Sequence, residues 1–452
     1  MAPLTLLVGP NSSGKSSISD ALLLVAQSRF RTLPDDEQSP KWGGNLVDLG
    51  SFADVVYNHK ADRDIEIGVE VRAGFLGKGM LKEENCRANI HFILRAGKND
   101  KVGRLASICF TDYLSGQELD LRYVPGALRV RFAGHATDIS HHELRNLQLR
   151  GSYRHWRSER RFFERYVFRP LRKIPKRVRG SDAAWERLGL SLDFFLWPIF
   201  NEVERVSSGR APARRWYSLL EAQTDARRSR ASDVYDEVDP TMLTSSVDPR
   251  FTPYYEGLRF ETRSRQMTGL PISLPGALEE LDIAEDISST TVSPYHLSID
   301  VKDNRTGIRS NLLDVGYGAS QVIPVLRGCM SRARGPLIVE QPEIHLHPRA
   351  QSIVAGYLAK RSQHRQTIVE THSVHVVNQA RLLVAAGVLP AEDVIVLFVG
   401  RSKAGSVVHP IRINAQGDFS AEWPTGYGFF EERYRDTLEL LRLKGKPPRE
   451  SE

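Results

Sequence analysis

Residues 9–17, GPNSSGKSS, are the stretch whose residue types and spacing are best suited to chemistry. Gly9, Gly14, Lys15 and Ser16 fit the pattern Gly-x4-Gly-Lys-Ser. Glycines let the backbone wrap closely enough for successive N–H groups to point at phosphate oxygens, and a following helix N-terminus adds partial positive charge. In this pattern the lysine reaches the β- and γ-phosphates and the serine hydroxyl binds Mg²⁺. The stretch therefore predicts a phosphate cradle.

The residues on either side of the cradle match the structural context that it requires. Leu4 to Val8 form an apolar run typical of a buried strand, and Ile18, Ala21, Leu22 and Val25 give the following residues one apolar helical face. Strand, glycine-rich turn and helix N-terminus are thus predicted in the required order.

A second group of polar residues follows a short apolar strand at Leu337–Val339. This strand leads into Glu340, Gln341 and Glu343, at the edge of a parallel sheet where open α/β folds bind ligands. Carboxylates there could hold Mg²⁺ and polarise an attacking water molecule. The next strand, in QTIVETHS, delivers His372 to the same edge, where it is placed to sense a γ-phosphate.

The segment LLDVGYGASQVIPVL predicts a third element. Its Gly316, Gly318, Ser320 and Gln321 stand at the start of an apolar helix, which makes a second helix-N-terminus anion site.

Composition limits the classes of protein that this chain can represent. The 452 residues are 41% hydrophobic and 26% charged, as in ordinary globular proteins, and the length predicts two or three subdomains. The sequence has neither a run of about 18 apolar residues nor a basic-then-apolar leader, so we expect a cytoplasmic protein that does not span a membrane. Three widely spaced cysteines, Cys86, Cys109 and Cys329, support neither a disulfide framework nor a zinc site.

The excess positive charge is concentrated in one segment. Between Arg145 and Arg187 there are 14 Lys and Arg against 4 Asp and Glu, whereas the net charge of the whole chain is only +7. Aromatic residues alternate with the arginines, so the segment predicts a surface for DNA or RNA, with an acidic protein partner as the alternative and a solvated helical insert as the plainest interpretation. The predicted phosphate contacts are Arg154, Arg157, Arg160, Arg161 and Arg165.

The pattern of apolar residues changes along the chain. From Asp64 to Phe132 it has period two, as in DIEIGVEVR, which predicts an antiparallel meander. From Tyr295 onward, short apolar strands alternate with helical stretches, which is typical of a parallel sheet wound by helices. We therefore expect an N-terminal lobe at 1–135, a basic and mainly helical insert at 136–293, and a C-terminal lobe at 294–452.

Together, GPNSSGKSS, GYGASQ, VEQPEIHLHP and ETHS resemble the ATP-binding-cassette type of ATPase, and more narrowly its soluble branch with SMC, RecF-like and OLD-like proteins. They are most similar to stand-alone bacterial defence-associated ATPases, such as the Septu and retron ATPase subunits. The resemblance covers the first 60 residues and residues 300–443. It implies an α/β fold: a P-loop ABC-type ATPase head with an antiparallel β subdomain and an inserted helical region.

The resemblance also implies roles for individual residues. Ser16 and Glu340 would bind Mg²⁺, and His372 would be the switch histidine. Gly318, Ser320 and Gln321 would form a signature loop that contacts the γ-phosphate bound to a second subunit, so that two heads dimerise around ATP. ATP itself would be held by Gly9, Asn11, Ser12, Ser13, Gly14, Lys15, Ser16 and Ser17.

The sequence departs from the family pattern at three places. Glu340 stands where such ATPases commonly have Asp, and Gln341 stands where the catalytic Glu usually follows. Glutamine cannot act as a general base, so either Glu343 or His372 serves the water, or the protein is mainly a slow ATP-gated clamp. Such folds also carry a strand hairpin before the cradle strand, which predicts that Met1 lies inside the first subdomain.

The rest of the chain suggests a regulator that acts through another protein. No nuclease constellation follows the ETHS strand, so we expect a separate effector chain, such as a nuclease, in antiviral defence. A RecF- or SMC-type role in DNA repair or on chromosomes is the alternative. A small-molecule kinase or GTPase would leave GYGASQ and ETHS unexplained, and a transporter ATPase would need a membrane partner.

Overall fold

The structure is a computed structural model of the 452-residue chain. It describes residues 1–28, 40–44, 46–72, 87–96, 102–112, 116, 118–132, 135–140, 203–210, 213–218, 273–293, 296–331, 333, 335–403, 405–421 and 423. The basic segment, with the five arginines predicted to contact nucleic acid, lies outside these residues.

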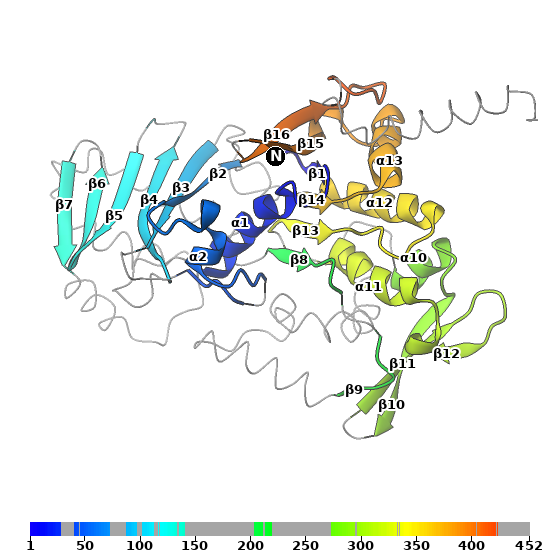
Figure 1. The fold of residues 1–452 in the computed structure, drawn as a ribbon. Coiled ribbons are helices and arrows are strands. Elements are labelled where there is room, and N and C mark those ends of the chain that lie inside the picture. The colour runs from blue at the N-terminus through cyan, green and yellow to red at the C-terminus, as the bar shows by residue number, and fades with distance from the viewer. Residues whose placement is uncertain are drawn as a thin grey trace, which may run out of the picture.

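A six-stranded sheet, with strand order β16-β15-β1-β14-β13-β8, forms the centre of the molecule (Figure 1). Five of its strands run parallel, and only β16 runs antiparallel to its neighbour. The strands are β1 (Leu4–Val8), β8 (Glu204–Val206), β13 (Leu337–Glu340), β14 (Thr367–Glu370), β15 (Val394–Ser402) and β16 (Gly405–Arg412).

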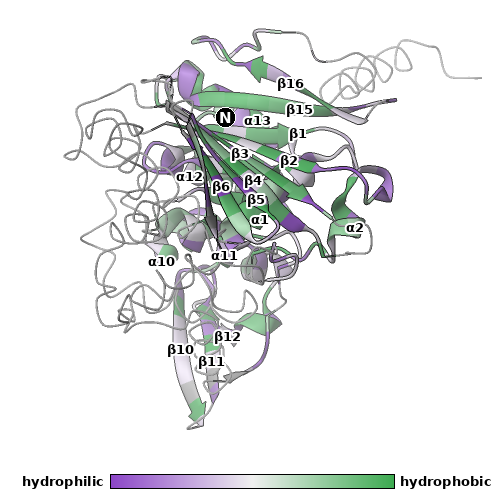
Figure 2. Cartoon of the chain, turned by 90° about the vertical axis from the view of Figure 1, so that its left-hand side faces the viewer, coloured by the Kyte–Doolittle hydropathy of each residue, from purple (hydrophilic) through white to green (hydrophobic). Residues whose placement is uncertain are grey.

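The central strands are buried on both faces, as a helix-covered parallel sheet requires. Every residue of β1 is buried, and Figure 2 shows β1 and β15 as largely hydrophobic. Alternate residues of β1 enter different clusters: Leu4 and Leu6 pack in one core, and Leu7 in another with Leu23 of the first helix. The long apolar runs of the sequence are explained by this double burial.

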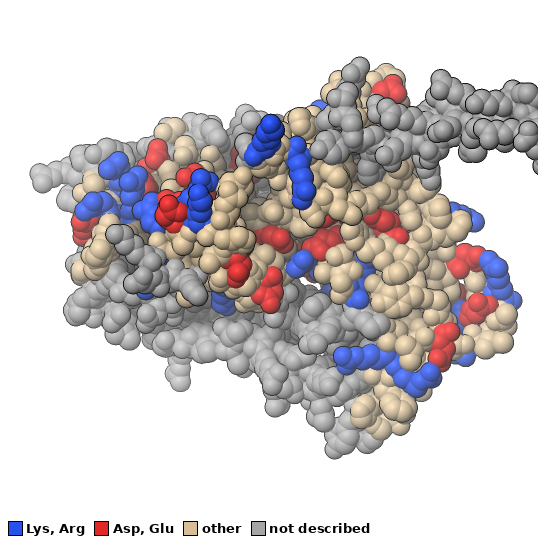
Figure 3. All heavy atoms as spheres, viewed as in Figure 1, with Lys and Arg blue, Asp and Glu red and all other residues tan. Residues whose placement is uncertain are grey.

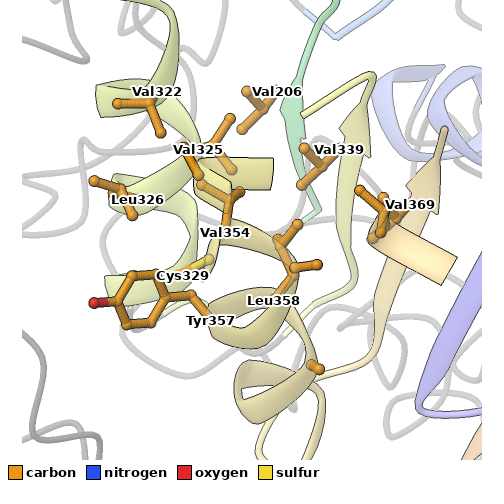
Figure 4. Close-up of a cluster of buried hydrophobic side chains, with 14 of the residues drawn as sticks. Val206, Val322, Val325, Leu326, Cys329, Val339, Val354, Tyr357, Leu358 and Val369 are labelled. Carbon is orange, nitrogen blue, oxygen red and sulfur yellow. The ribbon is translucent and has the colours of Figure 1, made fainter. Parts of the chain in front are cut away.

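Four helices connect these strands: α1 (Lys15–Ser28), α11 (Tyr317–Met330), α12 (Pro348–Ser362) and α13 (Val374–Ala385). Two of them begin at side-chain caps. At the start of α13, the Ser373 hydroxyl accepts from the His375 and Val376 N–H groups. At the start of α12, the His347 side chain accepts from the Arg349 N–H. Figure 4 shows α11 and α12 packing valine and leucine side chains against β8, β13 and β14.

A second six-stranded sheet confirms the predicted antiparallel meander. Its strands pair in chain order and fan out at the left of Figure 1. Its apolar face packs with Leu24 and Val25 of α1 and with Phe52. Phe52 begins the short helix α2 (Phe52–Val55), and the 3-10 turn η2 (Tyr57–His59) follows it. The strands are β2 (Ile65–Arg72), β3 (Arg87–Arg95), β4 (Arg104–Asp112), β5 (Glu118–Val124), β6 (Ala127–Phe132) and β7 (His135–Ser140).

A smaller antiparallel sheet leads into α11. Strand β11 (His296–Lys302) pairs with β10 (Asp286–Ser293), β12 (Arg309–Asn311) and β9 (Tyr217–Ser218). Helix α10 (Leu274–Glu280) lies between β9 and β10 in the chain, and the 3-10 turn η6 (Leu312–Asp314) joins β12 to α11. A further turn, η7 (Ala391–Asp393), precedes β15.

The structure differs from the expected domain boundaries at β8. Residues Glu204–Val206 fall inside the segment assigned to a helical insert, yet they form the edge strand of the parallel sheet beside β13. The three-residue sequence ERV carries two charges and no periodic pattern, so nothing in it predicts a strand. Both charged side chains of the strand form ion pairs, Glu204 with Arg365 and Arg205 with Glu340.

Glu204 is the residue that fixes this edge strand most firmly. Its carboxylate accepts from Arg365 Nη1 and from the Ser331 hydroxyl, each at 2.6 Å. Burial favours the neutral acid, but the charges of Arg365 and Arg327 and these hydrogen bonds hold the pKa of Glu204 below its usual value. Because the folded pKa is depressed, this contribution to stability is present above the usual pKa of glutamate and is lost as pH falls toward the folded value.

We predict that Glu204→Ala lowers the free energy of unfolding by about 3–5 kcal/mol, because it leaves the fully buried Arg365 guanidinium without its counter-charge. Urea denaturation followed by circular dichroism measures this loss. Arg129→Ala, which breaks an exposed ion pair with Asp138 on the meander, is the matched control and should shift the midpoint little. Equal shifts in the two variants would contradict the role given to Glu204.

Candidate nucleotide site

The loop between β1 and α1 has the backbone conformation that a phosphate cradle needs. Gly9 and Gly14 have φ of +142° and +97°, and Ser12 has φ of +56°. A Cβ on Gly9 would lie 2.2 Å from the carbonyl oxygen of Val399, so this position admits only glycine. The loop turns directly into the N-terminus of α1 at Lys15. Backbone N–H groups and the positive end of the helix are thus presented together.

Lys15 is 4% exposed and lies across the base of the loop. Its Nζ donates to the carbonyl oxygens of Gly9, at 3.2 Å, and Pro10, at 2.8 Å. Burial lowers the pKa of this ammonium group, and the nearby carboxylate of Glu370 opposes that shift. The ammonium group is therefore held within the loop that the sequence assigns to phosphate.

A cleft of about 430 Å³ opens over the loop. Its wall consists of loop residues together with Gln341, Glu370 and His372, which follow or end strands β13 and β14. Figure 3 shows acidic side chains gathered near the middle of this face of the molecule. The expected convergence of the phosphate loop, Gln341 and His372 at one sheet edge is present.

The carboxylate closest to Ser16 is that of Glu370. The Ser16 hydroxyl donates to Glu370 Oε2 at 3.0 Å and lies 3.2 Å from Oε1. Burial raises the pKa of Glu370, with the charge of Glu340 adding to the rise and the hydrogen bond from Ser16 opposing it. Burial likewise raises the pKa of Asp20, one turn along α1, to about 6.

Glu340, expected beside Ser16, instead contacts residues that follow and form β8. Its Oε1 accepts from Arg205 Nε at 2.7 Å, and its Oε2 accepts from the Ser208 N–H at 3.1 Å. Arg210 donates to the carbonyl oxygens of Glu340 and Gln341, at 3.0 and 2.9 Å. Glu340 therefore contacts the edge strand β8 and the residues after it, whereas Ser16 contacts Glu370.

Glu343 contacts the Thr371–His372 segment and is not among the residues that line the cleft. Its Oε1 accepts from the backbone N–H of His372 at 2.7 Å, and its Oε2 accepts from the Thr371 hydroxyl at 2.9 Å. Burial raises the pKa of Glu343, against these hydrogen bonds. His372 itself lines the cleft, and burial, followed by the charge of Lys15, lowers its pKa. Glu343 thus fixes the segment that presents His372.

Gln341 is held at the tip of β13 in a left-handed conformation, with φ of +44°. Its backbone N–H donates to the carbonyl oxygen of Glu370 at 2.7 Å, which joins the tips of β13 and β14. Gln341 is part of the cleft wall.

The GYGASQ loop packs against the loop that follows β13, and it contributes no residue to the cleft wall of its own chain. A Cβ on Gly318 would lie 2.7 Å from the His345 carbonyl oxygen, and the Tyr317 ring packs edge-on against His345 with centroids 4.7 Å apart. The side chains of Ser320 and Gln321 are buried, whereas Gly316 and Tyr317 are exposed.

Several residues at the site were not predicted from the sequence. Arg205, Ser208 and Arg210 come from the segment assigned to the insert, where no motif marks them. Arg401, in the hairpin of β15 and β16, donates from Nε to the Ser12 carbonyl oxygen at 2.8 Å. Glu370 had a usable signal, because it ends an apolar strand just before the predicted switch histidine.

Comparison with known families agrees with this geometry. Residues 157–378 match the family described as "AAA domain, putative AbiEii toxin, Type IV TA system". The match covers slightly less than half of the chain and indicates similarity to AAA-type ATPases. The matched residues include α11, β13 and β14, and the loop between β1 and α1 lies before them in the sequence. The expected α/β fold, with a P-loop between β1 and α1, is confirmed by the sheet order and by the loop that leads into α1.

Solved structures similar to this chain include three SMC heads, each with 12% sequence identity. A head bound to the C-winged helix domain of ScpA has a TM-score of 0.37 and covers 91% of this chain and 90% of its own. A head from Thermotoga maritima has a TM-score of 0.31 with the same coverage. One derived from Pyrococcus furiosus, bound to the C-terminal domain of ScpA, has a TM-score of 0.33 and covers 97% and 93%. No curated protein matches the chain.

The residues of the loop fit a nucleotide phosphate. The buried Ser13 hydroxyl has no hydrogen-bond partner among the described residues, and a Cβ on Gly14 would close the loop against the Ser406 hydroxyl at 2.4 Å. No group of three or more His, Cys, Asp or Glu in the described part of the chain could hold a metal ion by itself. A site with few protein ligands suits Mg²⁺, which keeps several waters and binds mostly through nucleotide phosphates. Among the described helices, none is long and apolar enough to cross a bilayer.

We predict that Gly9→Ala abolishes nucleotide binding, because the added methyl group collides with the Val399 carbonyl and Gly9 has a positive φ. Fluorescence of a mant-labelled ATP analogue measures the binding. Gly126→Ala is the matched control, since Gly126 also has a positive φ of +77° but open space around it, in the turn between β5 and β6. Normal binding by Gly9→Ala would exclude this loop as the phosphate site.

Proposed function

We propose that the chain binds ATP with Mg²⁺ in the cleft above the phosphate loop, hydrolyses it slowly, and dimerises head to head around it to control a separate effector protein. The observation that supports this most strongly is the composition of the cleft wall. Phosphate-loop residues, Gln341, Glu370 and His372 all face one volume of about 430 Å³. These are the positions from which phosphates, a metal ion and an attacking water can be contacted together.

Each residue has a distinct task in this proposal. The loop N–H groups and the N-terminus of α1 hold the phosphates, and Lys15 exchanges its contacts with Gly9 and Pro10 for the β- and γ-phosphates. Bound Mg²⁺ supplies charge stabilisation for the transferred phosphoryl group. Gln341 orients the attacking water through its amide, which accepts no proton at neutral pH, so turnover is slow.

His372 is the better supported candidate to act on the water. It lines the cleft, whereas both carboxylate oxygens of Glu343 are bound to the Thr371–His372 segment. We propose that Glu343 acts on hydrolysis through the position of His372.

Dimerisation is supported by the location of the GYGASQ loop. Its exposed part, Gly316 and Tyr317, lies outside the cleft wall of its own chain and beside the exposed Leu313. A second copy would bring this loop and the N-terminus of α11 to the γ-phosphate from the open side, which makes the complete site a property of two chains.

The effector and its setting are proposed from the sequence and from the family description. That description names a putative toxin of a type IV toxin–antitoxin system, which fits a chain that works with a partner in antiviral defence. DNA or RNA binding by Arg154, Arg157, Arg160, Arg161 and Arg165 stays a prediction, as do the cytoplasmic location and the alternative role in DNA repair.

We predict that Lys15→Ala abolishes both ATP binding and ATP-dependent dimerisation, because it removes a charge-assisted contact to phosphate. Mant-ATP fluorescence measures binding, and sedimentation velocity measures the dimer. An oligomer that is unchanged in Lys15→Ala and indifferent to ATP would place the assembly on another surface.

A second variant separates dimerisation from binding. Tyr317→Glu places a charge on the exposed part of the GYGASQ loop, so it should prevent the dimer while ATP binding is retained. Val292→Glu, at an exposed position of β10, is the matched control and should leave both intact. A Tyr317→Glu dimer of normal strength would exclude this loop from the interface.

We predict that Glu343→Gln and His372→Ala each slow ATP hydrolysis in a single turnover without loss of ATP binding, and that Gln341→Glu does not slow it. If Glu343 acts through His372, the double variant is no slower than His372→Ala alone. Multiplied losses in the double variant would make Glu343 an independent base, and wild-type rates in Glu343→Gln would remove it from the mechanism.

A further inference from the structure

We propose that Glu370, at the end of β14, is the protein carboxylate that holds the divalent cation of the bound nucleotide together with Ser16. This assignment rests on the proposed binding of ATP in the cleft. The order of the motifs suggests Ser16 and Glu340 as the cation ligands. In this assignment Glu370 of β14 takes the place of Glu340 of β13.

Glu370 contacts Ser16 directly. Both carboxylate oxygens lie within 3.2 Å of the hydroxyl that binds Mg²⁺ in phosphate loops of this type. Hydroxyl and carboxylate oxygens are the ligands that Mg²⁺ accepts. Both residues also line the cleft, so a cation bound between them can contact nucleotide phosphates.

Glu340 already has a counter-charge in Arg205. Arg205 lies 2.6 Å from Glu340 Oε1, and Ser208 donates its N–H to Oε2 at 3.1 Å and its hydroxyl at 3.3 Å. The Glu340 side chain is only 8% exposed and is absent from the cleft wall. A divalent cation on Glu340 would have to displace the guanidinium group or sit beside it, and like charges at that distance repel.

The strand order places Glu370 on the strand next to β1. β14 lies between β1 and β13, and its register pairs Glu370 with Leu7 on one side and with Glu340 on the other. Neighbouring strands are about 4.8 Å apart, so Glu340 starts one strand further from the loop that follows β1. Glu370 is the carboxylate on the strand adjacent to the phosphate loop.

This arrangement also explains why an amide is tolerated at Gln341. The backbone N–H of Gln341 donates to the carbonyl oxygen of Glu370, and both residues line the same cleft. With Glu370 present on the next strand, the cleft keeps a carboxylate although position 341 has none.

The experiment measures how strongly Mg²⁺ tightens the binding of a non-hydrolysable mant-labelled ATP analogue to the full-length protein. Titrations are made with excess Mg²⁺ and with EDTA. In Glu370→Gln we expect the Mg²⁺-dependent gain in affinity to fall at least about 10-fold. Affinity in EDTA should be unchanged or higher, because a negative charge near the phosphates has been removed. Glu370→Asp should keep part of the gain.

Glu340→Gln is the matched variant, with the same chemical change on the adjacent strand, and it should keep the Mg²⁺-dependent gain. As a second readout, electron paramagnetic resonance of Mn²⁺ should show a nucleotide-dependent bound ion in wild type and in Glu340→Gln, and a weakened one in Glu370→Gln. Circular dichroism verifies that each variant is folded.

The possible results separate the two proposals. Loss of the gain in Glu340→Gln with retention in Glu370→Gln would return the cation to Glu340 and overturn this assignment. Equal binding with Mg²⁺ and EDTA in wild type would also overturn it, while ATP binding itself would stand. A wild-type protein that binds no nucleotide under either condition would refute the proposed function.

Discussion

The parallel pairing of β1 with β14 and β15 is the constraint on which the rest of the structure depends. Because these strands run in one direction, the turns that follow β1, β13 and β14 all open at the same edge of the sheet. The phosphate loop is more than 300 residues from Gln341 and His372 in the sequence. They share one cleft because the parallel strands bring their turns to the same sheet edge. Complete burial of β1 and β14 makes the register resistant to slippage, since a shift by one residue would reverse the face of every side chain.

Charge at this edge is divided between two strands. On β13, Glu340 is neutralised by Arg205 and held by Ser208, so that its carboxylate connects β13 to the edge strand β8. On β14, Glu370 accepts a hydrogen bond from the Ser16 hydroxyl and lines the cleft. Two neighbouring carboxylates of equal chemistry thus differ in their surroundings, since Glu340 is bound to the edge strand and Glu370 lines the cleft.

The loops around the cleft are fixed by side chains that bind their backbone groups. Arg210 binds the carbonyl oxygens of Glu340 and Gln341, and Arg401 binds that of Ser12. Glu343 fixes the Thr371–His372 segment by accepting from it at both oxygens. Such contacts preorganise the loops, because a catalytic geometry is maintained only where the supporting residues are themselves held.

The sequence by itself determined the glycine-rich loop, the antiparallel meander, the strand that ends in Glu340 and the strand that precedes His372. Each depends on local pattern: glycine spacing before a helix, period-two alternation, or an apolar run ending in polar residues. Only the tertiary structure decided that Glu204–Val206 is a strand, since its charged residues are stabilised by Arg365 and Glu340, which lie far along the chain. It also decided which carboxylate meets Ser16. That choice depends on which strand lies next to β1, and strand order is set by the packing of helices on both faces of the sheet, which no local pattern encodes.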